Sequence, residues 1–333
     1  MSQFLIISKR EISASRTKAI IKTLDFIQRV KLDTVLWAPG RQVCRVWPLE
    51  GGMSAQLVGI ELDQAISGTE RFVARSPSAY LRTLFDDAAQ HEFKVLDALA
   101  SAPIPTPKVT WLSPPCENRY FVMEFLTGEA TANPANSKEF VASMAKALAN
   151  IHRTPISAPL QNLLPKTKPR FEPFREALND ELREPAIVDL LLEWGDHGDE
   201  MQGLRHGDFW PGNILWNNNA VSGIVDWENA LLGPPLADLA ISRLDIFWIL
   251  GEQAMDEFTQ LYLSENPLDP SLLAYWDLRA AIRPMGNLPE WPAPYSALHR
   301  PDIDYDYLKE RLMCFADRAI FNAQQFLHQR NSD

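Results

Sequence analysis

The sequence is poor in cysteine. Its 333 residues include three, Cys44, Cys116 and Cys314, which is an odd number at wide and unpatterned spacing. Such spacing fits neither a disulfide framework nor a zinc site. It predicts reduced, buried thiols in a cytoplasmic protein.

Long apolar runs are also absent. The N-terminal segment MSQFLIISKREIS has an apolar run too short for a signal peptide and no small-residue cleavage site. The most apolar later segment, Leu236 to Leu250, is interrupted by Asp238, Arg243 and Asp245. A membrane-spanning helix needs about 20 predominantly apolar residues, so we expect no membrane partner.

Positively charged residues are fewer than negatively charged ones. Lys and Arg total 32 against 43 Asp and Glu, which gives a formal net charge of −11. Nucleic-acid backbones are held by clustered Lys and Arg, so we expect no nucleic-acid partner. The net charge is compatible with a neutral or cationic substrate. The length is typical of about two domains.

The stretch from Leu204 to Leu239 carries acids and an amide at fixed places. Asp208 closes an H-G-D triplet, Asn213 follows five residues later, and Asp226 ends an apolar run after an Asn-rich turn at residues 217–219. The catalytic loop of protein kinases, with its later metal-binding Asp, has the same residue types at the same spacing.

These residue types suit phosphoryl transfer. A hydroxyl is a poor nucleophile until a carboxylate accepts its proton, which Asp208 could do. Mg²⁺ takes oxygen ligands, and Asn213 and Asp226 would supply an amide oxygen and a carboxylate. Pro211-Gly212 would turn the chain so that the side chains converge. The alternative is a purely structural loop, because an isolated H-G-D triplet is common by chance.

The stretch resembles the signature of the aminoglycoside phosphotransferase and choline kinase family, the small-molecule relatives of protein kinases. The resemblance rests on H-G-D with its Asn, on I-V-D-W-E at residues 224–228, and on G-P-P-x-x-D-L at residues 233–239. It implies that the chain transfers the γ-phosphoryl group of ATP or GTP to a hydroxyl of a small-molecule acceptor, with Mg²⁺.

The same resemblance implies the fold class. The expected class is an α+β, two-lobed protein-kinase-like fold with a small antiparallel-sheet N-lobe and a larger, mostly helical C-lobe. Residues 1–125 would form an N-terminal helix and the nucleotide-binding N-lobe. Residues 126–333 would form the catalytic and substrate-binding lobe.

The first part of the chain reads as a helix followed by a hairpin. Apolar residues at helical spacing predict a helix over residues 13–30, which would pack on the small lobe or form a dimer contact. Residues 43–62 read as strand, turn and strand. By resemblance, Gly51, Gly52 and Ser54 in the turn would bind nucleotide phosphates, although an ordinary hairpin turn is the simpler interpretation.

The next strand, residues 71–75, ends at the place where a kinase has its phosphate-binding Lys. Here that residue is Arg75, whose planar guanidinium also suits phosphate. A helix over residues 86–100 carries Glu92, which the resemblance pairs with Arg75. A surface Arg and a solvated helix Glu are the alternatives.

Residues 120–125 read as an apolar strand that the resemblance identifies with the hinge between the lobes. Met123 would line the adenine site, Glu124 would offer its C=O, and Leu126 would offer its N–H to the adenine edge.

Helices and connectors follow the hinge. We expect a helix capped by Ser137 and leading to His152, a loop over residues 155–175 and a helix over residues 176–194. Asp238 would open a further helix, in a capping or scaffold role. Later helices are expected at 252–263, 270–282 and 305–328, with a Pro-rich loop or connector at 284–300.

Two rivals differ in class. One is a catalytically weak, kinase-like nucleotide-binding regulatory protein, for which Arg75 leaves room. The other is a protein kinase, against which stand the short glycine loop, the absence of an A-P-E segment after Asp226, and Trp227-Glu228 in place of Phe-Gly.

Overall fold

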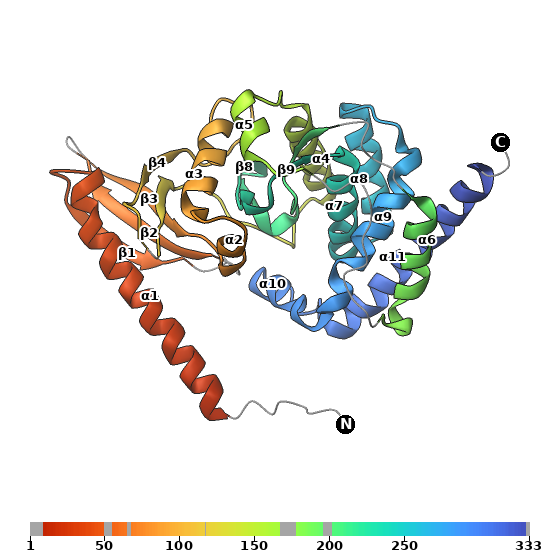
Figure 1. Cartoon of the computed structure of the whole chain (residues 1–333), viewed down its shortest axis with the longest axis horizontal. Coiled ribbons are helices and arrows are strands. Elements are labelled where there is room, and N and C mark those ends of the chain that lie inside the picture. Colours follow the sequence, from red (N-terminus) through yellow and green to blue (C-terminus); the bar gives the residue numbers. More distant parts are fainter. Residues whose placement is uncertain are drawn as a thin grey trace. The chain divides into compact units, whose positions relative to one another are not determined.

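The computed structural model of the chain describes residues 9–49, 55–64, 68–116, 118–166, 178–195 and 202–330. The chain forms two compact units, one from residues 1–93 and 108–125 and the other from residues 94–107 and 126–333. The first unit is built around a sheet and the second is mostly helical, as expected (Figure 1). No helix in the described ranges is long and apolar enough to cross a membrane.

The first unit contains one five-stranded antiparallel sheet with strand order β1-β2-β3-β5-β4. Its strands are β1 (Val43–Pro48), β2 (Gln56–Asp63), β3 (Thr69–Ser76), β4 (Val109–Leu112) and β5 (Phe121–Glu124). The strands expected around residues 43–62, 71–75 and 120–125 are therefore confirmed. Short antiparallel connections suit a sheet assembled from sequence neighbours.

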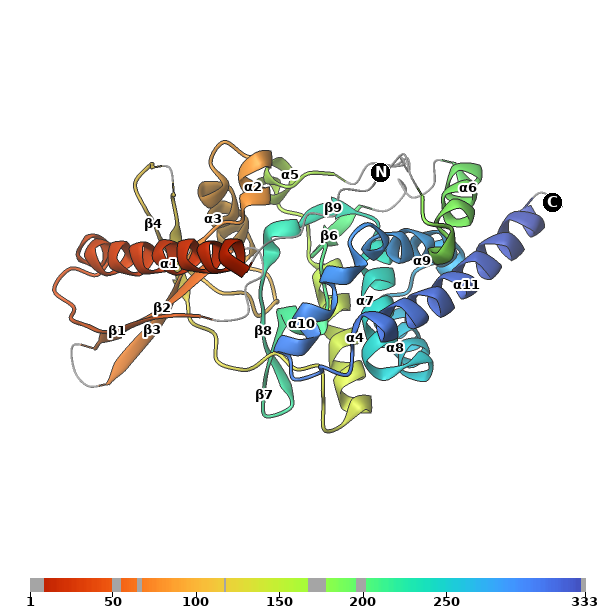
Figure 2. The ribbon, with the colours of Figure 1, turned by 90° about the horizontal axis from the view of Figure 1, so that it is seen from below.

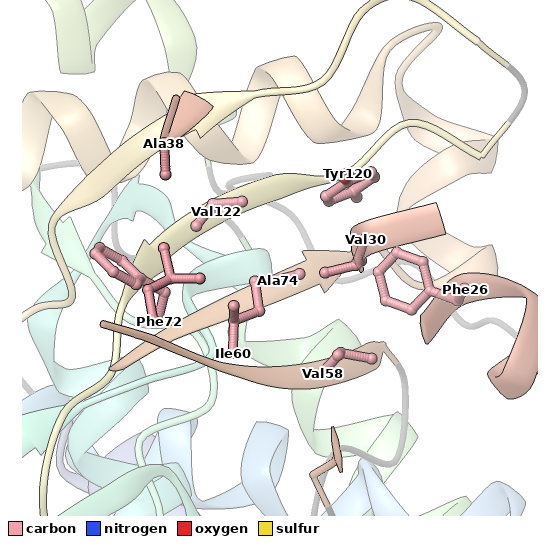
Figure 3. Close-up of a cluster of buried hydrophobic side chains, with 10 residues drawn as sticks. Phe26, Val30, Ala38, Val58, Ile60, Phe72, Ala74, Tyr120 and Val122 are labelled. Atoms are coloured by element: carbon pink, nitrogen blue, oxygen red, sulfur yellow. The ribbon is translucent and has the colours of Figure 1, made fainter. Parts of the chain in front are cut away.

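Helix α1 (Lys9–Trp37) is longer than the predicted helix and lies along this sheet (Figures 1 and 2). Side chains from one face of α1 meet alternate residues of the strands, as the two periodicities require (Figure 3). The buried cluster comprises Phe26, Val30, Ala38, Val58, Ile60, Leu62, Phe72, Ala74, Tyr120 and Val122. Of the two roles left open for this helix, packing on the sheet is therefore observed.

Two helices follow β3, α2 (Ala79–Leu84) and α3 (Ala88–Leu99). Phe93 of α3 packs edge-on against Phe121, with ring centroids 6.2 Å apart. Phe121 alternates with the Tyr120 and Val122 side chains that face α1. Helix α3 therefore packs on the face of the sheet opposite α1.

The second unit is built around α7 (Pro235–Leu250), whose residues are almost all buried. Helices α8 (Glu252–Glu265) and α9 (Leu273–Ile282) pack against it. Helix α4 (Ser137–Arg153) packs on α8, and α11 (Tyr305–Arg330) packs on α9 and α6 (Glu184–Trp194) (Figure 2). Two small sheets pair β6 (Gly203–Arg205) with β9 (Leu231–Gly233), and β7 (Ile214–Asn217) with β8 (Ala220–Ile224).

Two local predictions in this unit were wrong, and a third was right only in part. Asn136, not Ser137, caps α4, because its side chain accepts bonds from the backbone N–H groups of Lys138 and Glu139. The expected loop at 155–175 contains helix α5 (Ala158–Leu163). The expected helix at 176–194 is broken at Arg183, whose φ of 65° is left-handed.

The Pro-rich connector at 284–300 contains short 3₁₀ turns and helix α10 (Pro292–Ala297). The expectation of buried thiols was also wrong. Cys44, Cys116 and Cys314 are all exposed, because they lie on an edge strand, in a loop and on the outer face of α11.

Candidate active site

Asp208 and Asn213 lie in the loop between β6 and β7. The loop ends in a 3₁₀ turn, Pro211–Asn213, that runs directly into β7. The Asn213 amide nitrogen donates to the Asp208 carbonyl oxygen at 2.9 Å and to Asp208 Oδ2 at 3.2 Å. The predicted base and the predicted metal ligand are therefore held together by direct hydrogen bonds.

The hairpin β7–β8 brings Asp226 to the same place. Its central residues Asn218 and Asn219 both have positive φ, which matches the right-handed twist of a tight hairpin. Pairing aligns Ile214 with Ile224, and the Val225 N–H donates to the Asn213 carbonyl oxygen at 2.9 Å. Asp226 is the next residue, and its φ of 65° turns the chain at that point.

Gly207 is needed because the loop is tight. Its φ is +81°, a conformation that residues with a side chain rarely adopt. A Cβ atom there would collide with the Asn229 carbonyl group, lying 2.9 Å from its carbon atom. The position therefore accepts glycine alone without a shift of the loop.

Asp238 fixes the start of this loop from the first turn of α7. Its carboxylate accepts bonds from Arg205 Nε at 2.9 Å, from the His206 N–H at 2.7 Å and from the Gly207 N–H at 3.2 Å. Burial alone would raise the pKa of Asp238, but Arg205, and then His152 and His206, hold that pKa well below its usual value. Asp238 is therefore a scaffold residue, as expected, but it caps the loop rather than its own helix.

Two buried histidines lie near Asp238 and the loop. His206 is fully buried, and its Nε2 lies 2.9 Å from the Val225 carbonyl oxygen, beside Asp226. His152 Nδ1 lies 2.6 Å from the Tyr262 hydroxyl, and burial lowers its pKa although Asp238 opposes the shift. His152 therefore has a structural role, through its contacts with Tyr262 and Asp238.

Arg283 contacts the predicted base and was missed by the sequence analysis. It follows the last residue of α9, and its Nη2 lies 3.2 Å from Asp208 Oδ1. Nothing in the local pattern marks this arginine, because it lies 75 positions from Asp208. A basic residue at a helix end beside a Pro-rich segment is the one signal that was available.

Arg75 and Glu92 are brought together in the first unit. Arg75 Nε lies 2.5 Å from Glu92 Oε1, and both side chains are buried. The ion pair expected from the sequence is thus present between β3 and α3. Two buried charges need each other, because removing either partner would leave the other unpaired in a low-dielectric interior.

The predicted hinge residues follow one another at the end of β5. Met123 is buried between β3 and β4, whereas Glu124 is exposed and its N–H donates to the Lys108 carbonyl oxygen at 2.8 Å. Leu126 belongs to the second unit, where its side chain packs over Gly223 of β8. The predicted phosphate-binding residues Gly51, Gly52 and Ser54 lie outside the described residues.

The donor set suits a hard divalent cation. The Asn213 nitrogen is committed to Asp208, so its oxygen is the end of the amide left for a metal. Asp226 adds a carboxylate, and no group of three His, Cys, Asp or Glu side chains that could hold a metal occurs in the described ranges. Mg²⁺ typically takes only one or two protein carboxylates and fills its octahedron with phosphates and water, so these residues fit it.

A family model described as the phosphotransferase enzyme family matches residues 48–275, which cover parts of both units and the whole of the loop. The chain belongs to this family.

An aminoglycoside 3'-phosphotransferase from Niallia circulans is 25% identical over 221 residues, which cover 61% of this chain and 78% of that protein. Acyl-CoA dehydrogenase family member 11 from Rattus norvegicus is 28% identical over 227 residues, which cover 60% of this chain but 28% of that protein. The chain thus spans most of one relative and about a quarter of the other.

Solved structures of the family share the fold. A thermostable mutant of an aminoglycoside phosphotransferase, in ternary complex with AMP-PNP and hygromycin B, matches with a TM-score of 0.57 at 17% identity. The match covers 87% of this chain and 98% of that one. The predicted protein-kinase-like fold, with a small antiparallel sheet and a larger helical part, is confirmed.

Proposed function

We propose that this protein transfers the γ-phosphoryl group of ATP or GTP to a hydroxyl of a small molecule. The observation that carries the proposal is the hydrogen-bonded loop in which Asn213 holds Asp208 and leads, through β7 and β8, to Asp226. A structural loop needs neither two acids nor an amide at these places. Membership of the phosphotransferase enzyme family supports the same reaction class.

Asp208 is the proposed general base. Its side chain is 31% exposed, so a carboxylate oxygen can reach an acceptor hydroxyl. In the step, the hydroxyl proton passes to Asp208 while the hydroxyl oxygen bonds to the γ-phosphorus. The bond from that phosphorus to the β–γ bridging oxygen breaks, and the nucleoside diphosphate leaves with the electron pair.

Asn213 and Asp226 are the proposed Mg²⁺ ligands. When bound, the ion would offset the negative charge of the phosphate oxygens. The protein's own contribution is to fix both donors on one hairpin, with the Asn213 amide oriented by Asp208. Such prior orientation lowers the cost of assembling the site when nucleotide binds.

Nucleotide binding is assigned to the residues predicted from the resemblance. Arg75, held by Glu92, would bind phosphate oxygens, because a guanidinium offers a planar fork of N–H donors. Gly51, Gly52 and Ser54 would bind phosphates, as the resemblance implies. Met123, Glu124 and Leu126 would contact the adenine or guanine base.

The test is phosphoryl transfer from γ-labelled ATP and GTP to a panel of small hydroxyl compounds, with and without Mg²⁺. The proposal expects a phosphorylated product that forms only with Mg²⁺. Metal-dependent binding of AMP-PNP without transfer to any acceptor would favour the nucleotide-binding regulatory protein. The absence of nucleotide binding would reject both functions.

A further inference from the structure

The proposed base, Asp208, forms an ion pair that phosphoryl transfer does not require. Arg283 Nη2 lies 3.2 Å from Asp208 Oδ1, and the Arg283 side chain is 36% exposed. Within the described part of the chain, Asp208 is the one hydrogen-bond partner of that side chain. A guanidinium has five N–H donors, so most of its donors remain available to a ligand.

The chemistry of Arg283 limits what can bind beside the base. Arginine donates and never accepts hydrogen bonds, and an ammonium group likewise only donates. A cationic acceptor would therefore place two donors of like charge together beside Asp208. A carboxylate or phosphate has the acceptor oxygens and the negative charge that a guanidinium binds in a bidentate manner.

We propose that Arg283 binds an oxyanion of the acceptor, so that the substrate is a hydroxy compound bearing a carboxylate or phosphate group near the reacting hydroxyl. This inference rests on the proposed function and names the substrate class of the same site. The observation behind it is the partly exposed ion pair between Arg283 and the base.

The ion pair also couples acceptor binding to the base. Arg283 donates to Oδ1 and Asn213 donates to Oδ2, so both carboxylate oxygens of Asp208 already accept a hydrogen bond. An incoming oxyanion gives Arg283 a second counter-ion and lets Oδ1 accept the hydroxyl proton. A neutral acceptor brings no counter-ion for Arg283, so the guanidinium continues to compete with the acceptor hydroxyl for the Asp208 carboxylate.

The neighbouring side chains support this assignment. Asp245 is buried in α7, and the Tyr295 hydroxyl already donates to its Oδ1 at 2.8 Å. Burial, with a smaller contribution from the charge of Asp208, raises the pKa of Asp245 to about 7. Asp245 is therefore a weaker counter-ion for Arg283 than Asp208 is. The tyrosine hydroxyl is committed, which leaves Arg283 as the donor for an acceptor oxygen.

Two aromatic residues, Trp210 and Tyr295, lie close to these charged side chains. The Trp210 and Tyr295 rings meet edge-on with centroids 5.6 Å apart, and the Trp210 ring lies close over Gly212 in the same loop as Asp208. Tyr295 is buried and supports Trp210 from behind, whereas Trp210 is only partly buried and can contact the carbon skeleton of a small acceptor. The net charge of −11 favours cations only at long range, whereas Arg283 acts in contact.

The experiment compares acceptors that share a skeleton and differ in charge. One series is gluconate, sorbitol and glucamine, with sorbitol phosphate to separate phosphate from carboxylate. A second series is hydroxybutyrate, butanediol and aminobutanol. We expect kcat/KM to be highest for an oxyanion member in the wild type. Arg283→Ala should raise KM for that member about 10- to 100-fold, as expected for a lost charge-assisted hydrogen bond.

Two further variants make the result specific. Arg283→Lys keeps the charge and should retain part of the preference for the oxyanion. Arg279→Ala removes the arginine one turn earlier on α9, which lies over the Tyr275 and Trp276 rings, and should retain the preference. A wild-type preference for the neutral or ammonium member would overturn the inference, and so would an oxyanion preference that survives in Arg283→Ala.

Calorimetry covers the case in which no member is phosphorylated. With AMP-PNP and Mg²⁺ bound, titration with the oxyanion members should show binding that Arg283→Ala abolishes. The absence of such binding would reject the inference about Arg283. Failure of the proposed function is distinguishable, because it appears in the wild type as the absence of phosphoryl transfer to every compound of the wider hydroxyl panel, or as the absence of Mg²⁺-dependent nucleotide binding.

Discussion

Gly207→Ala tests whether the loop conformation positions the base. A left-handed φ costs a residue with a side chain roughly 1–2 kcal/mol. The added methyl would also collide with the Asn229 carbonyl group, and overpacking of this kind costs about 1–3 kcal/mol. Together the substitution should lower the free energy of unfolding by about 2–5 kcal/mol.

Gly40→Ala is the matched control. Gly40 has a φ of +82°, almost identical to that of Gly207, and among the described residues no atom lies within 4 Å of the Cβ it would gain. Gly40→Ala should therefore lower the free energy of unfolding only by the cost of the left-handed φ, about 1–2 kcal/mol. Urea denaturation of both variants measures the difference between the two costs.

Activity gives a second readout of the same change. Relief of the collision must move Gly207, and Asp208 is the next residue in the chain. A displacement of about 1 Å at a catalytic group costs on the order of 100-fold in rate. If Gly207→Ala were as stable as Gly40→Ala and transferred phosphoryl groups at the wild-type rate, the account of this loop would be refuted.

Three further predictions concern acids of the second unit. Asp238→Asn removes the counter-charge of buried Arg205, so urea denaturation should show a loss of at least about 3 kcal/mol. The Asp245 pKa of about 7 exceeds its unfolded value, so the folded state binds the extra proton and stability falls as pH rises from about 4 to 7. Asp245→Asn should remove that part of the pH dependence, and stability curves of the two proteins that run parallel across this range would contradict it. Asp226→Asn should weaken the Mg²⁺ dependence of AMP-PNP binding by calorimetry, whereas unchanged dependence would exclude Asp226 as a ligand.

Much of the geometry of the candidate site could be predicted because its residues are local in sequence. Asp208, Asn213 and Asp226 lie within one loop and one hairpin, so their spacing and the Asn-rich turn carry most of the geometry. The strands of the first unit were found for the same reason, since antiparallel neighbours are joined by short connections.

The failures have physical reasons. Asn136 and Ser137 are both good helix caps, and the choice between them depends on backbone angles that composition does not specify. Helix α5 is only six residues long and is stabilised by the burial of Leu160, which is a tertiary effect.

The contact of Arg283 with Asp208 could not be predicted from the sequence. That contact depends on where α9 ends, which in turn depends on packing against α7. One bond in that packing is the buried ion pair between Arg243 and Asp277. Long-range contacts of this kind leave no periodic signal in the sequence.

The most direct test of the central claim is Asp208→Asn, assayed for transfer from labelled nucleotide and for AMP-PNP binding with Mg²⁺. Asp189→Asn, an exposed acid on α6 of the same unit, is the control. We expect the Asp208 variant to bind AMP-PNP as the wild type does and to lose roughly 100- to 10,000-fold in transfer rate. Transfer at the wild-type rate in Asp208→Asn would contradict the assignment of the base and the mechanism built on it.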